Sequence, residues 1–216
     1  MNLKRRNFPI VLQGIPYILP PAVITLILGL WGEIYLFVPF LILTLFCLFF
    51  FRNPSRQIPD GEGLILSPAD GRIVEVEKGV EVPLLGGEAT KVSIFMSLFD
   101  VHVNRVPVGG TVEEVRYQRG RFLPAYRGEA SRQNEQNALL LQSAEDLKLV
   151  FVQVAGIVAR RIVCHVRRGD RVQRGKIFGA ILFGSRLDVY LPKGMEATVC
   201  RGERVKGGES VLGVIK

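Results

Sequence analysis

Two long uncharged stretches at the N-terminus limit what this chain can fold into more than any other feature. Residues 7–32 contain no charged side chain, and after a single Glu33 residues 34–51 contain none either. Each stretch approaches the roughly 20 apolar residues that a helix needs to cross a bilayer. The pair predicts an α-helical membrane hairpin that turns near Glu33. Pro16, Pro20 and Pro21 in the first stretch predict that its helix begins near Pro21.

Basic residues flank both outer ends of this predicted hairpin. They are Lys4, Arg5 and Arg6 before it and Arg52 and Arg56 after it. Because Lys and Arg are enriched on the cytoplasmic side of membrane segments, both ends are expected in the cytoplasm. A cleaved signal peptide is the competing interpretation, but the apolar region is doubled and lacks a small-residue cleavage site. A hairpin that only dips into one leaflet also stays open, because both halves are short.

The rest of the chain is predicted to be β structure. From residue 64 onward, short apolar runs alternate with Gly, Pro and Asp turns, which is the spacing of antiparallel strands. The predicted strands are residues 72–76, 91–95, 110–115, 147–154, 162–166, 177–182, 188–191, 197–200 and 211–215. Residues 119–137 are polar and irregular, which predicts a long loop over a site or toward the membrane. The expected domains are the hairpin at residues 1–56 and a β-rich domain at residues 57–216.

An internal repeat refines this fold class. Residues 169–175 read Gly-Asp-Arg-Val-Gln-Arg-Gly, and residues 202–208 read Gly-Glu-Arg-Val-Lys-Gly-Gly. Each copy leads into an apolar strand, and glycines at both ends suit two matching tight turns. Two related hairpins that fold on each other resemble the barrel-sandwich architecture of biotinyl and lipoyl carrier domains. Residues 67–71, Ser-Pro-Ala-Asp-Gly, have the form of a third such turn.

Composition narrows the choice of partners. The net charge is +8 and the basic residues are spread along the chain, which beside a membrane segment favours an anionic lipid surface. A generically basic soluble protein fits the charge alone equally well. Nucleic acid is disfavoured, because no run of Lys and Arg lies beside aromatic residues. The three cysteines form no CxxC pair, and with two histidines no His-rich metal site is expected.

Residues 183–186, Phe-Gly-Ser-Arg, lie between the two copies of the repeat and between two predicted strands. A Gly-Ser pair alone is a weak signal, and an ordinary hairpin turn is the simplest interpretation. In a strained turn, however, the hydroxyl of Ser185 can attack the carbonyl of Gly184. Gly184 has no Cβ, so it permits both the unusual backbone and the close approach.

Five short segments follow one another in an order that is far more specific than any one of them. They are Phe-Phe-Arg-Asn-Pro at 50–54, Ser-Pro-Ala-Asp-Gly at 67–71, Asp-Val-His-Val-Asn-Arg-Val-Pro at 100–107, Ala-Arg-Arg-Ile at 159–162 and Phe-Gly-Ser-Arg at 183–186. In order and spacing they resemble the short-form phosphatidylserine decarboxylases, including the membrane hairpin in front. The resemblance implies a pyruvoyl-dependent carboxy-lyase of phospholipid biosynthesis, which converts phosphatidylserine to phosphatidylethanolamine.

The resemblance also implies that the chain is a zymogen that cuts itself. In this family the Gly-Ser bond is cleaved by the protein, so the expected products are residues 1–184 and 185–216, held together as a heterodimer. Attack by Ser185 on the Gly184 carbonyl would give an ester, and elimination and hydrolysis would convert Ser185 to a pyruvoyl group. The ketone of that group would form a Schiff base with the substrate amine, which makes pyridoxal phosphate and a metal unnecessary.

Asp70 and His102 are the expected supporting groups. A serine hydroxyl is a weak nucleophile at neutral pH and needs a base, which in turn needs an orienting carboxylate. His102 suits both the elimination and the reprotonation of the substrate carbon. The simpler alternatives are a turn role for Asp70 and a polar strand position for His102.

One position departs from part of the family. Long-form members carry a second histidine three residues after the first, where this chain has Arg105. Arginine cannot act as a base at neutral pH, so either His102 serves both cleavage and decarboxylation or the site is built differently. Arg105 and Asn104 are instead predicted to bind the substrate, because arginine holds carboxylate and phosphate groups well.

The expected place of action is the cytoplasmic face of the cell membrane, with an anionic phospholipid as substrate. The main alternative is a membrane-anchored barrel-sandwich module that binds or carries a group without catalysis. Such a module needs a modifiable lysine at a hairpin tip, and Lys176, Lys193 and Lys206 lack the flanking methionines. A zinc peptidase of the β-sheet type is a third alternative. It is disfavoured, because neither of the two histidines lies in a metal-ligand motif.

Overall fold

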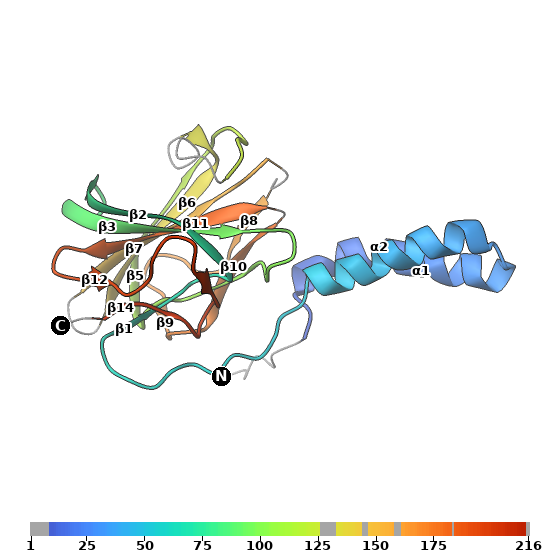
Figure 1. Ribbon diagram of the computed structural model, residues 1–216, viewed down its shortest axis with the longest axis horizontal. Coiled ribbons are helices and arrows are strands. Elements are labelled where there is room, and N and C mark those ends of the chain that lie inside the picture. The colour runs from blue at the N-terminus through green and yellow to red at the C-terminus, as the bar shows by residue number, and fades with distance from the viewer. Residues whose placement is uncertain (1–8, 126–132, 144–146, 158–160, 183, 215–216) are drawn as a thin grey trace. The chain divides into compact units, whose positions relative to one another are not determined.

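The chain divides into two compact units, Met1–Ser55 and Arg56–Lys216 (Figure 1). The computed structural model describes residues 9–125, 133–143, 147–157, 161–182 and 184–214. The first unit is helical, and the second is built from strands. This confirms the predicted mainly β fold preceded by an N-terminal helical hairpin.

The N-terminal unit is a pair of antiparallel helices. A short 3-10 helix, η1 (Leu12–Gly14), leads into α1 (Ile15–Trp31), and the chain returns as α2 (Ile34–Phe50) after a turn at Gly32 and Glu33. Gly32 ends α1 in the left-handed conformation, at φ 77°, which a residue without a Cβ adopts without strain.

The prediction that the first helix begins near Pro21 is wrong, because α1 begins at Ile15 and runs through Pro20 and Pro21. Pro16 lies in the first turn, where a missing N–H removes no helical hydrogen bond. Proline inside an apolar helix is also tolerated when neighbouring groups satisfy the backbone. Separately, the hydroxyl of Thr25 donates to the carbonyl of Pro21 at 2.7 Å, one turn back in α1.

Most of the apolar surface of the hairpin faces outward. The hydroxyls of Thr25 and Thr44 lie 3.2 Å apart between the two helices, whereas Leu26, Leu30 and Ile42 are mostly exposed. So much exposed apolar surface suits lipid rather than water. By length and composition the helical segment Leu12–Trp31 could span a membrane, and α2 is shorter.

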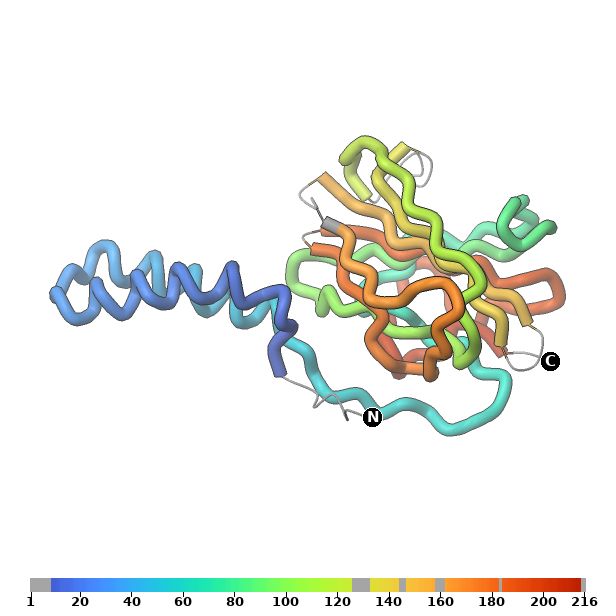
Figure 2. The backbone as a smooth tube through the Cα atoms, turned by 180° about the vertical axis from the view of Figure 1, so that it is seen from behind, coloured from blue at the N-terminus to red at the C-terminus, as the bar shows by residue number. Residues whose placement is uncertain are grey.

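Among its described residues the second unit has one curled eight-stranded sheet and two three-stranded sheets. Figure 2 shows the path of its backbone from behind. The large sheet has the order β13-β2-β3-β11-β7-β6-β5-β9, and the small sheets have the orders β1-β14-β12 and β4-β10-β8. The bounds are β1 Leu64–Leu66, β2 Gly71–Val82, β3 Gly87–Met96, β4 Val103–Arg105, β5 Gly110–Gln118, β6 Gln136–Ser143, β7 Lys148–Val154, β8 Arg161–Cys164, β9 Arg171–Val172, β10 Ile177–Leu182, β11 Ser185–Pro192, β12 Glu196–Ala197, β13 Arg204–Val205 and β14 Val211–Val214.

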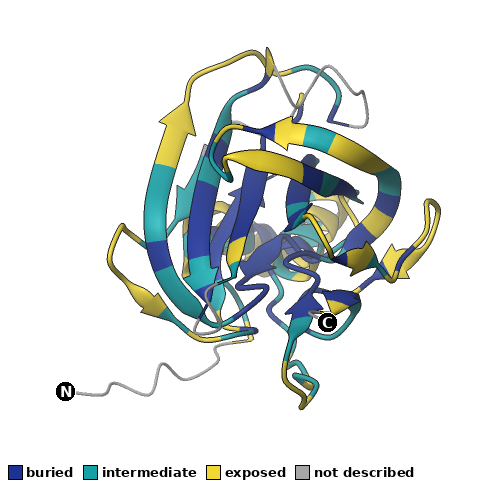
Figure 3. Cartoon of the chain, turned by 90° about the vertical axis from the view of Figure 1, so that its left-hand side faces the viewer, coloured by how far each residue is buried: buried dark blue, intermediate teal, exposed yellow. Residues whose placement is uncertain are grey.

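The core of this unit lies between the three sheets. Leu187 and Val189 of β11 are completely buried and pack in one cluster with Ile65 of β1, Phe178 of β10 and Leu212 of β14. Alternate residues of a strand point to opposite faces, so this set defines the inner face of the large sheet. Figure 3 shows the buried residues concentrated on the strands in the middle of the unit.

The two copies of the sequence repeat cap the two edges of the large sheet. In the first copy β9 pairs with β5, and the amide of Gly169 donates to the carbonyl of Val112 at 2.7 Å. In the second copy β13 pairs with β2, and the amide of Gly202 donates to the carbonyl of Ile73 at 2.8 Å. The two glycines have φ values of 88° and 96°. The repeat therefore makes matching backbone turns, as the predicted barrel-sandwich architecture requires.

Candidate active site

Gly184 and Ser185 lie at one end of the large sheet, where β10 ends and β11 begins. β11 is a central strand with β3 on one side and β7 on the other. Ser185 is the register partner of Met96, the last residue of β3, and Arg186 is the partner of Val154, the last residue of β7. The ends of three neighbouring strands therefore meet around Ser185.

The side chain of Ser185 is completely buried, and its Oγ has no hydrogen-bond partner among the residues that the structure describes. Leaving a buried polar group unsatisfied costs about 1–3 kcal/mol. Gly184, the residue before it, has a φ of 56°, in the left-handed region that favours glycine. A lone buried hydroxyl beside an unusual turn marks this position as a candidate reactive group.

His102 lies alongside β10, directly before β4. Its carbonyl accepts a hydrogen bond from the amide of Ile181 at 3.3 Å, which places His102 near the end of the strand that leads to Gly184. The residue is 3% exposed, and its Nδ1 lies 3.0 Å from the carbonyl oxygen of Asp100. Because a carbonyl only accepts, this contact requires a proton on Nδ1, so Nε2 is the basic nitrogen of the neutral ring.

The turn that carries His102 is itself fixed by Asp100. The carboxylate of Asp100 accepts hydrogen bonds from the amide and the hydroxyl of Ser97, at 2.8 and 2.7 Å. Ser97 follows Met96, the register partner of Ser185. The turn thus leads from a position beside Ser185 to a position beside β10, which explains how His102 is held at this end of the sheet.

Asp70 also lies at this end, directly before β2, but its carboxylate is bound elsewhere. Arg56 donates to both carboxylate oxygens at 2.9 and 2.7 Å, and the amide of Gly207 donates to Oδ1 at 2.8 Å. Within the described ranges no hydrogen bond joins Asp70 to His102. The structure therefore does not bring these two together as a base and its orienting carboxylate.

Arg105 belongs to the same group of charges as Asp70. Its guanidinium is buried and donates to the carbonyl of Gly175 at 3.1 Å. Burial lowers the pKa of Arg105, and the charge of Arg56 lowers it further, whereas the carboxylates of Asp70 and Glu209 raise it. Arg56, Asp70, Arg105 and Glu209 form a mixed cluster of two positive and two negative side chains. Any anionic substrate group at Arg105 would compete with these two carboxylates.

Asn104 is completely buried within the unit. Its amide oxygen accepts from Nε2 of Gln153 at 2.9 Å, and Oε1 of Gln153 accepts from Nδ2 of Asn137 at 3.1 Å. These bonds connect β4, β7 and β6 through the interior. Asn104 thus contacts other side chains in this form of the chain, and its contact with a substrate stays a prediction.

Gly156, two residues after the end of β7, lies against the Gly184 carbonyl, a contact that no sequence pattern indicated. A Cβ built on Gly156 would overlap the carbonyl oxygen of Gly184 and would lie 3.2 Å from the Cβ of Ala125. The missing side chain therefore leaves the space that the Gly184 carbonyl occupies. Sequence reasoning could not find this residue, because a glycine after a strand is common at ordinary turns.

The loop after β5 is tied to this region by a buried arginine. Nη1 of Arg186 donates to the carbonyl of Ala125 at 3.2 Å, and Nε lies 2.9 Å from Oδ1 of Asp188. Both Arg186 and Asp188 are 1% exposed. A buried arginine is costly unless its charge is paired, so this ion pair allows a charged residue to follow Ser185 inside the sheet.

Asn134 fastens the same loop at a second point. Its side chain bonds both the amide and the carbonyl of Leu123, at 2.9 and 2.8 Å, and donates to the carbonyl of Ala155 at 2.7 Å. Residues 119–125 therefore form a loop held against the end of β7. Of the predicted long loop, residues 126–132 lie outside the described part, as do Ala159, Arg160 and Phe183 of the quoted sequence segments.

A groove of about 720 Å³ includes Arg186 but not Ser185 in its lining. No three His, Cys, Asp or Glu side chains of the described part come together as metal ligands.

The chain is similar in sequence to a known family over nearly its whole length. A family model described as phosphatidylserine decarboxylase matches residues 43–213. Relatives named phosphatidylserine decarboxylase proenzyme include those of Citrifermentans bemidjiense (45% identical, covering 99% of this chain and 100% of the relative), Geotalea uraniireducens (46%, covering 99% and 100%) and Syntrophus aciditrophicus (47%, covering 98% and 99%).

Proposed function

Because this chain belongs to the phosphatidylserine decarboxylase family, we propose that it converts phosphatidylserine to phosphatidylethanolamine with a pyruvoyl group made from its own Ser185. The observation that carries the proposal is the buried Ser185 hydroxyl, which has no hydrogen-bond partner among the described residues and follows the left-handed Gly184. The word proenzyme in the names of the relatives supports a chain that is processed before it acts.

The first step is an attack within the chain. Oγ of Ser185 adds to the carbonyl carbon of Gly184 while a base takes its proton, and we assign that base to Nε2 of His102. The bond between this carbon and the nitrogen of Ser185 then breaks as the nitrogen is protonated, which leaves an ester. The Ser185 hydroxyl supports this step, because a buried group without a hydrogen-bond partner among the described residues raises the energy of the uncut chain. The left-handed turn at Gly184 supports it by permitting the unusual backbone and the close approach.

The second step separates the two fragments. A base removes the α-proton of Ser185, the ester C–O bond breaks, and residues 1–184 leave with a terminal carboxylate. Water then replaces the nitrogen at residue 185, ammonia is released, and a pyruvoyl group remains at the start of residues 185–216. We assign these proton transfers to His102, because its carbonyl accepts from the amide of Ile181 in β10, the strand that leads to Gly184.

The pyruvoyl ketone would supply an electron sink for loss of carbon dioxide from a bound amino acid headgroup, so neither pyridoxal phosphate nor a metal is proposed. His102 would return a proton to the substrate carbon. Arg105 and Asn104 would bind the substrate, with Arg105 on its carboxylate or phosphate. The Asp70 carboxylate would have to leave its hydrogen bonds with Arg56 and bind His102 before it could orient the imidazole ring.

The hairpin and its basic flanks support action at the cytoplasmic face of the cell membrane, where the anionic phospholipid substrate lies. The two fragments would act as one heterodimer. No nucleic acid partner is proposed.

Replacing Ser185 by Ala tests the proposal. Denaturing electrophoresis of the wild type should show two fragments, and the Ser185→Ala chain should stay whole at 24.1 kDa and release no carbon dioxide. Ser93→Ala is a matched control, because Ser93 is equally buried on the neighbouring strand β3 and should leave cleavage intact. A wild-type chain that decarboxylates without ever being cut would disprove the mechanism, and the mass of the smaller fragment identifies its first residue.

A further inference from the structure

Four apolar side chains are exposed at the end of the large sheet where Ser185 lies. They are Leu98, Phe99, Phe122 and Ile157, with exposed fractions of 38, 70, 40 and 57%. These four residues are called the apolar rim below. Large apolar side chains at turn tips around a buried reactive position suggest a surface that meets something other than water.

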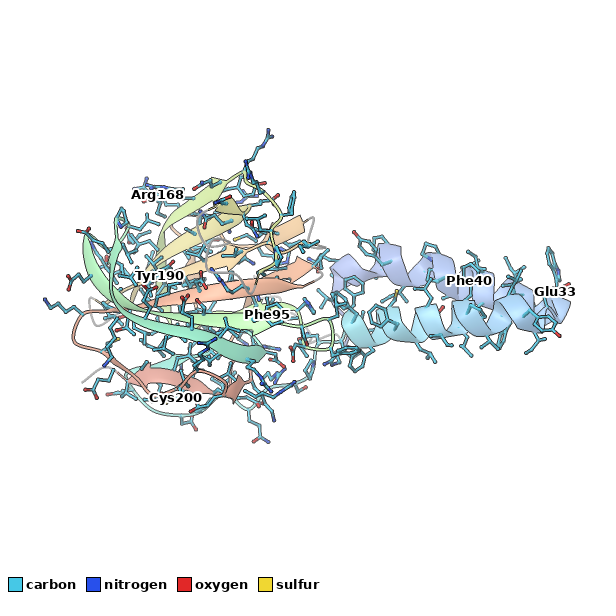
Figure 4. All side chains as sticks on the ribbon, turned by 45° about the horizontal axis from the view of Figure 1, so that its top comes forward. Glu33, Phe40, Phe95, Arg168, Tyr190 and Cys200 are labelled. Atoms are coloured by element: carbon cyan, nitrogen blue, oxygen red, sulfur yellow. The ribbon has the colours of Figure 1, made fainter. Side chains whose placement is uncertain are left out.

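The strand register explains why the apolar rim surrounds Ser185. Leu98 and Phe99 follow the last residue of β3, and Ile157 follows the end of β7; both strands are direct neighbours of β11. Phe122 follows β5, whose last residue is aligned through β6 with the end of β7. In Figure 4 the labelled Phe95 of β3 marks this end of the sheet, and Tyr190 lies farther along β11.

Exposed arginines lie beside the apolar rim, whereas the acidic neighbours Asp100 and Glu135 are only partly exposed. Arg119 and Arg121 are exposed on the loop that carries Phe122. The opposite end of the sheet, at the turn between β2 and β3, instead has the exposed pair Glu81 and Glu88. Apolar side chains backed by arginine are typical of surfaces that lie at the headgroup boundary of anionic bilayers.

We propose that the apolar rim enters the acyl-chain region of the membrane, so that a lipid passes from the bilayer to residue 185 without crossing water. This inference rests on the proposed function, because a substrate with two acyl chains has to leave a bilayer to reach a buried Ser185. A second copy of the chain is a poorer occupant, since pairing two such surfaces would bring their arginines together. The rim is a membrane contact separate from the helical hairpin.

The experiment places a single tryptophan on the apolar rim. Trp31→Phe removes the only tryptophan of the chain, and Phe99→Trp adds one at the most exposed rim position. The full chain is reconstituted in vesicles of phosphatidylcholine and phosphatidylserine with brominated acyl chains. Emission from Phe99→Trp should shift to shorter wavelength and be quenched by the bromine atoms, because the indole lies among the acyl chains.

A tryptophan at the opposite end of the sheet is the control. Leu84→Trp, in the same Trp31→Phe background, should be quenched far less, because Leu84 lies in the turn between β2 and β3. Equal quenching at both positions, or no quenching at Phe99→Trp, would overturn the inference. So would a blue shift that occurs without lipid and grows with protein concentration, which would indicate contact between copies.

A second variant connects the contact to catalysis. Phe99→Asp should raise the KM for phosphatidylserine in vesicles about tenfold, with a much smaller change in kcat, as expected from the loss of ~1.4 kcal/mol of membrane binding. Self-cleavage of this variant shows that its β unit has folded. An unchanged KM in a cleaved, active Phe99→Asp protein would refute the membrane contact of the apolar rim and leave the proposed function intact. A wild-type chain that never cleaves would instead refute the proposed function.

Discussion

Gly156 leaves a space that is filled by the carbonyl oxygen of Gly184, the bond partner of Ser185 in the proposed cleavage. A side chain at position 156 would push this carbonyl away from the position in which the Ser185 hydroxyl can reach it. The size of one residue thus bears directly on whether the chain can be cut.

Gly156→Ala should therefore slow self-cleavage about tenfold or more, because relieving the overlap costs about 1–3 kcal/mol and 1.36 kcal/mol corresponds to a factor of ten in rate. The accumulation of fragments over time on a denaturing gel measures the effect. Gly87→Ala is the matched control, since a Cβ at Gly87 meets nothing within 4 Å. A folded Gly156→Ala chain that is cut as fast as the wild type would show that this space has no role.

Replacement of His102 tests whether one base serves both cleavage and decarboxylation. If Nε2 of His102 is the base of both reactions, His102→Gln should slow cleavage and decarboxylation by about 10²–10⁴ each. His165→Gln should have little effect, because His165 is exposed and lies outside the group of residues around Ser185. Normal cleavage of His102→Gln with loss of decarboxylation would assign the cleavage base to another group.

At the scale of single elements, β2 and β3 are joined on the outer face of the sheet by an ion pair. Nζ of Lys91 lies 2.6 Å from a carboxylate oxygen of Glu75. Burial raises the pKa of Glu75, but the hydrogen bond and charge of Lys91, with help from Arg186 and Ser93, outweigh burial and leave this pKa lowered. The charged carboxylate thus stabilises the folded chain.

This stabilisation should depend on pH in a defined direction. Because the folded pKa of Glu75 is lowered, its contribution is fully present above the ordinary value of 4.5 and is lost as the pH falls through the folded pKa. Glu75→Gln should lower the Tm at pH 7, and the gap to the wild type should narrow below pH 4.5. Glu88→Gln, at an exposed position, serves as the control. A Tm difference between Glu75→Gln and the wild type that widens on acidification would contradict the stabilising role of the Glu75 carboxylate.

Much of the fold could be predicted from local sequence, since turns and strand spacing are local properties. The glycines of the repeat, such as Gly169 and Gly202, are enough to identify two matching turns. The start of β11 could not be predicted, because Ser185 and Arg186 are polar and the apolar pattern places the start of this strand at residue 188. Arg186 is buried with its charge paired to Asp188 and with the carbonyl of Ala125 as an acceptor, and such partners depend on the tertiary fold.

The candidate site was predictable only in part for the same reason. The position of Ser185 between two strands follows from the neighbouring apolar runs. The contacts of Asp70 with Arg56 and of Gly156 with Gly184 join residues that are far apart in the chain or unremarkable in type. The start of α1 could not be predicted from proline positions, because proline ends most helices in water, whereas an apolar helix tolerates Pro20 and Pro21.

At the scale of the whole molecule, cleavage after Gly184 would divide a chain whose strands remain interleaved. β11 would belong to the small fragment, while both of its neighbours, β3 and β7, would belong to the large one. Only the large fragment would contain the apolar hairpin. The small fragment would therefore be held at the membrane solely by its place in the sheet.

This arrangement predicts how the fragments behave in membranes. After washing with alkaline carbonate, residues 185–216 should remain in the membrane pellet with residues 1–184, although their described part contains no apolar helix. Urea at a concentration that unfolds the β unit should release the small fragment alone. Release by carbonate without denaturant would contradict the pairing of β11 with β3 and β7 in the cleaved protein.

The central position of β11 has a consequence for the life of each molecule. Two fragments made by a cut inside one sheet have already folded around a shared core as a single chain. Their molar ratio is therefore fixed at one to one, and dilution cannot separate them. Neither could be exchanged for a fresh copy, since removing β11 would unfold the strands on both sides. Loss of the reactive group at residue 185 would therefore be permanent, and activity would return only through synthesis of a new chain.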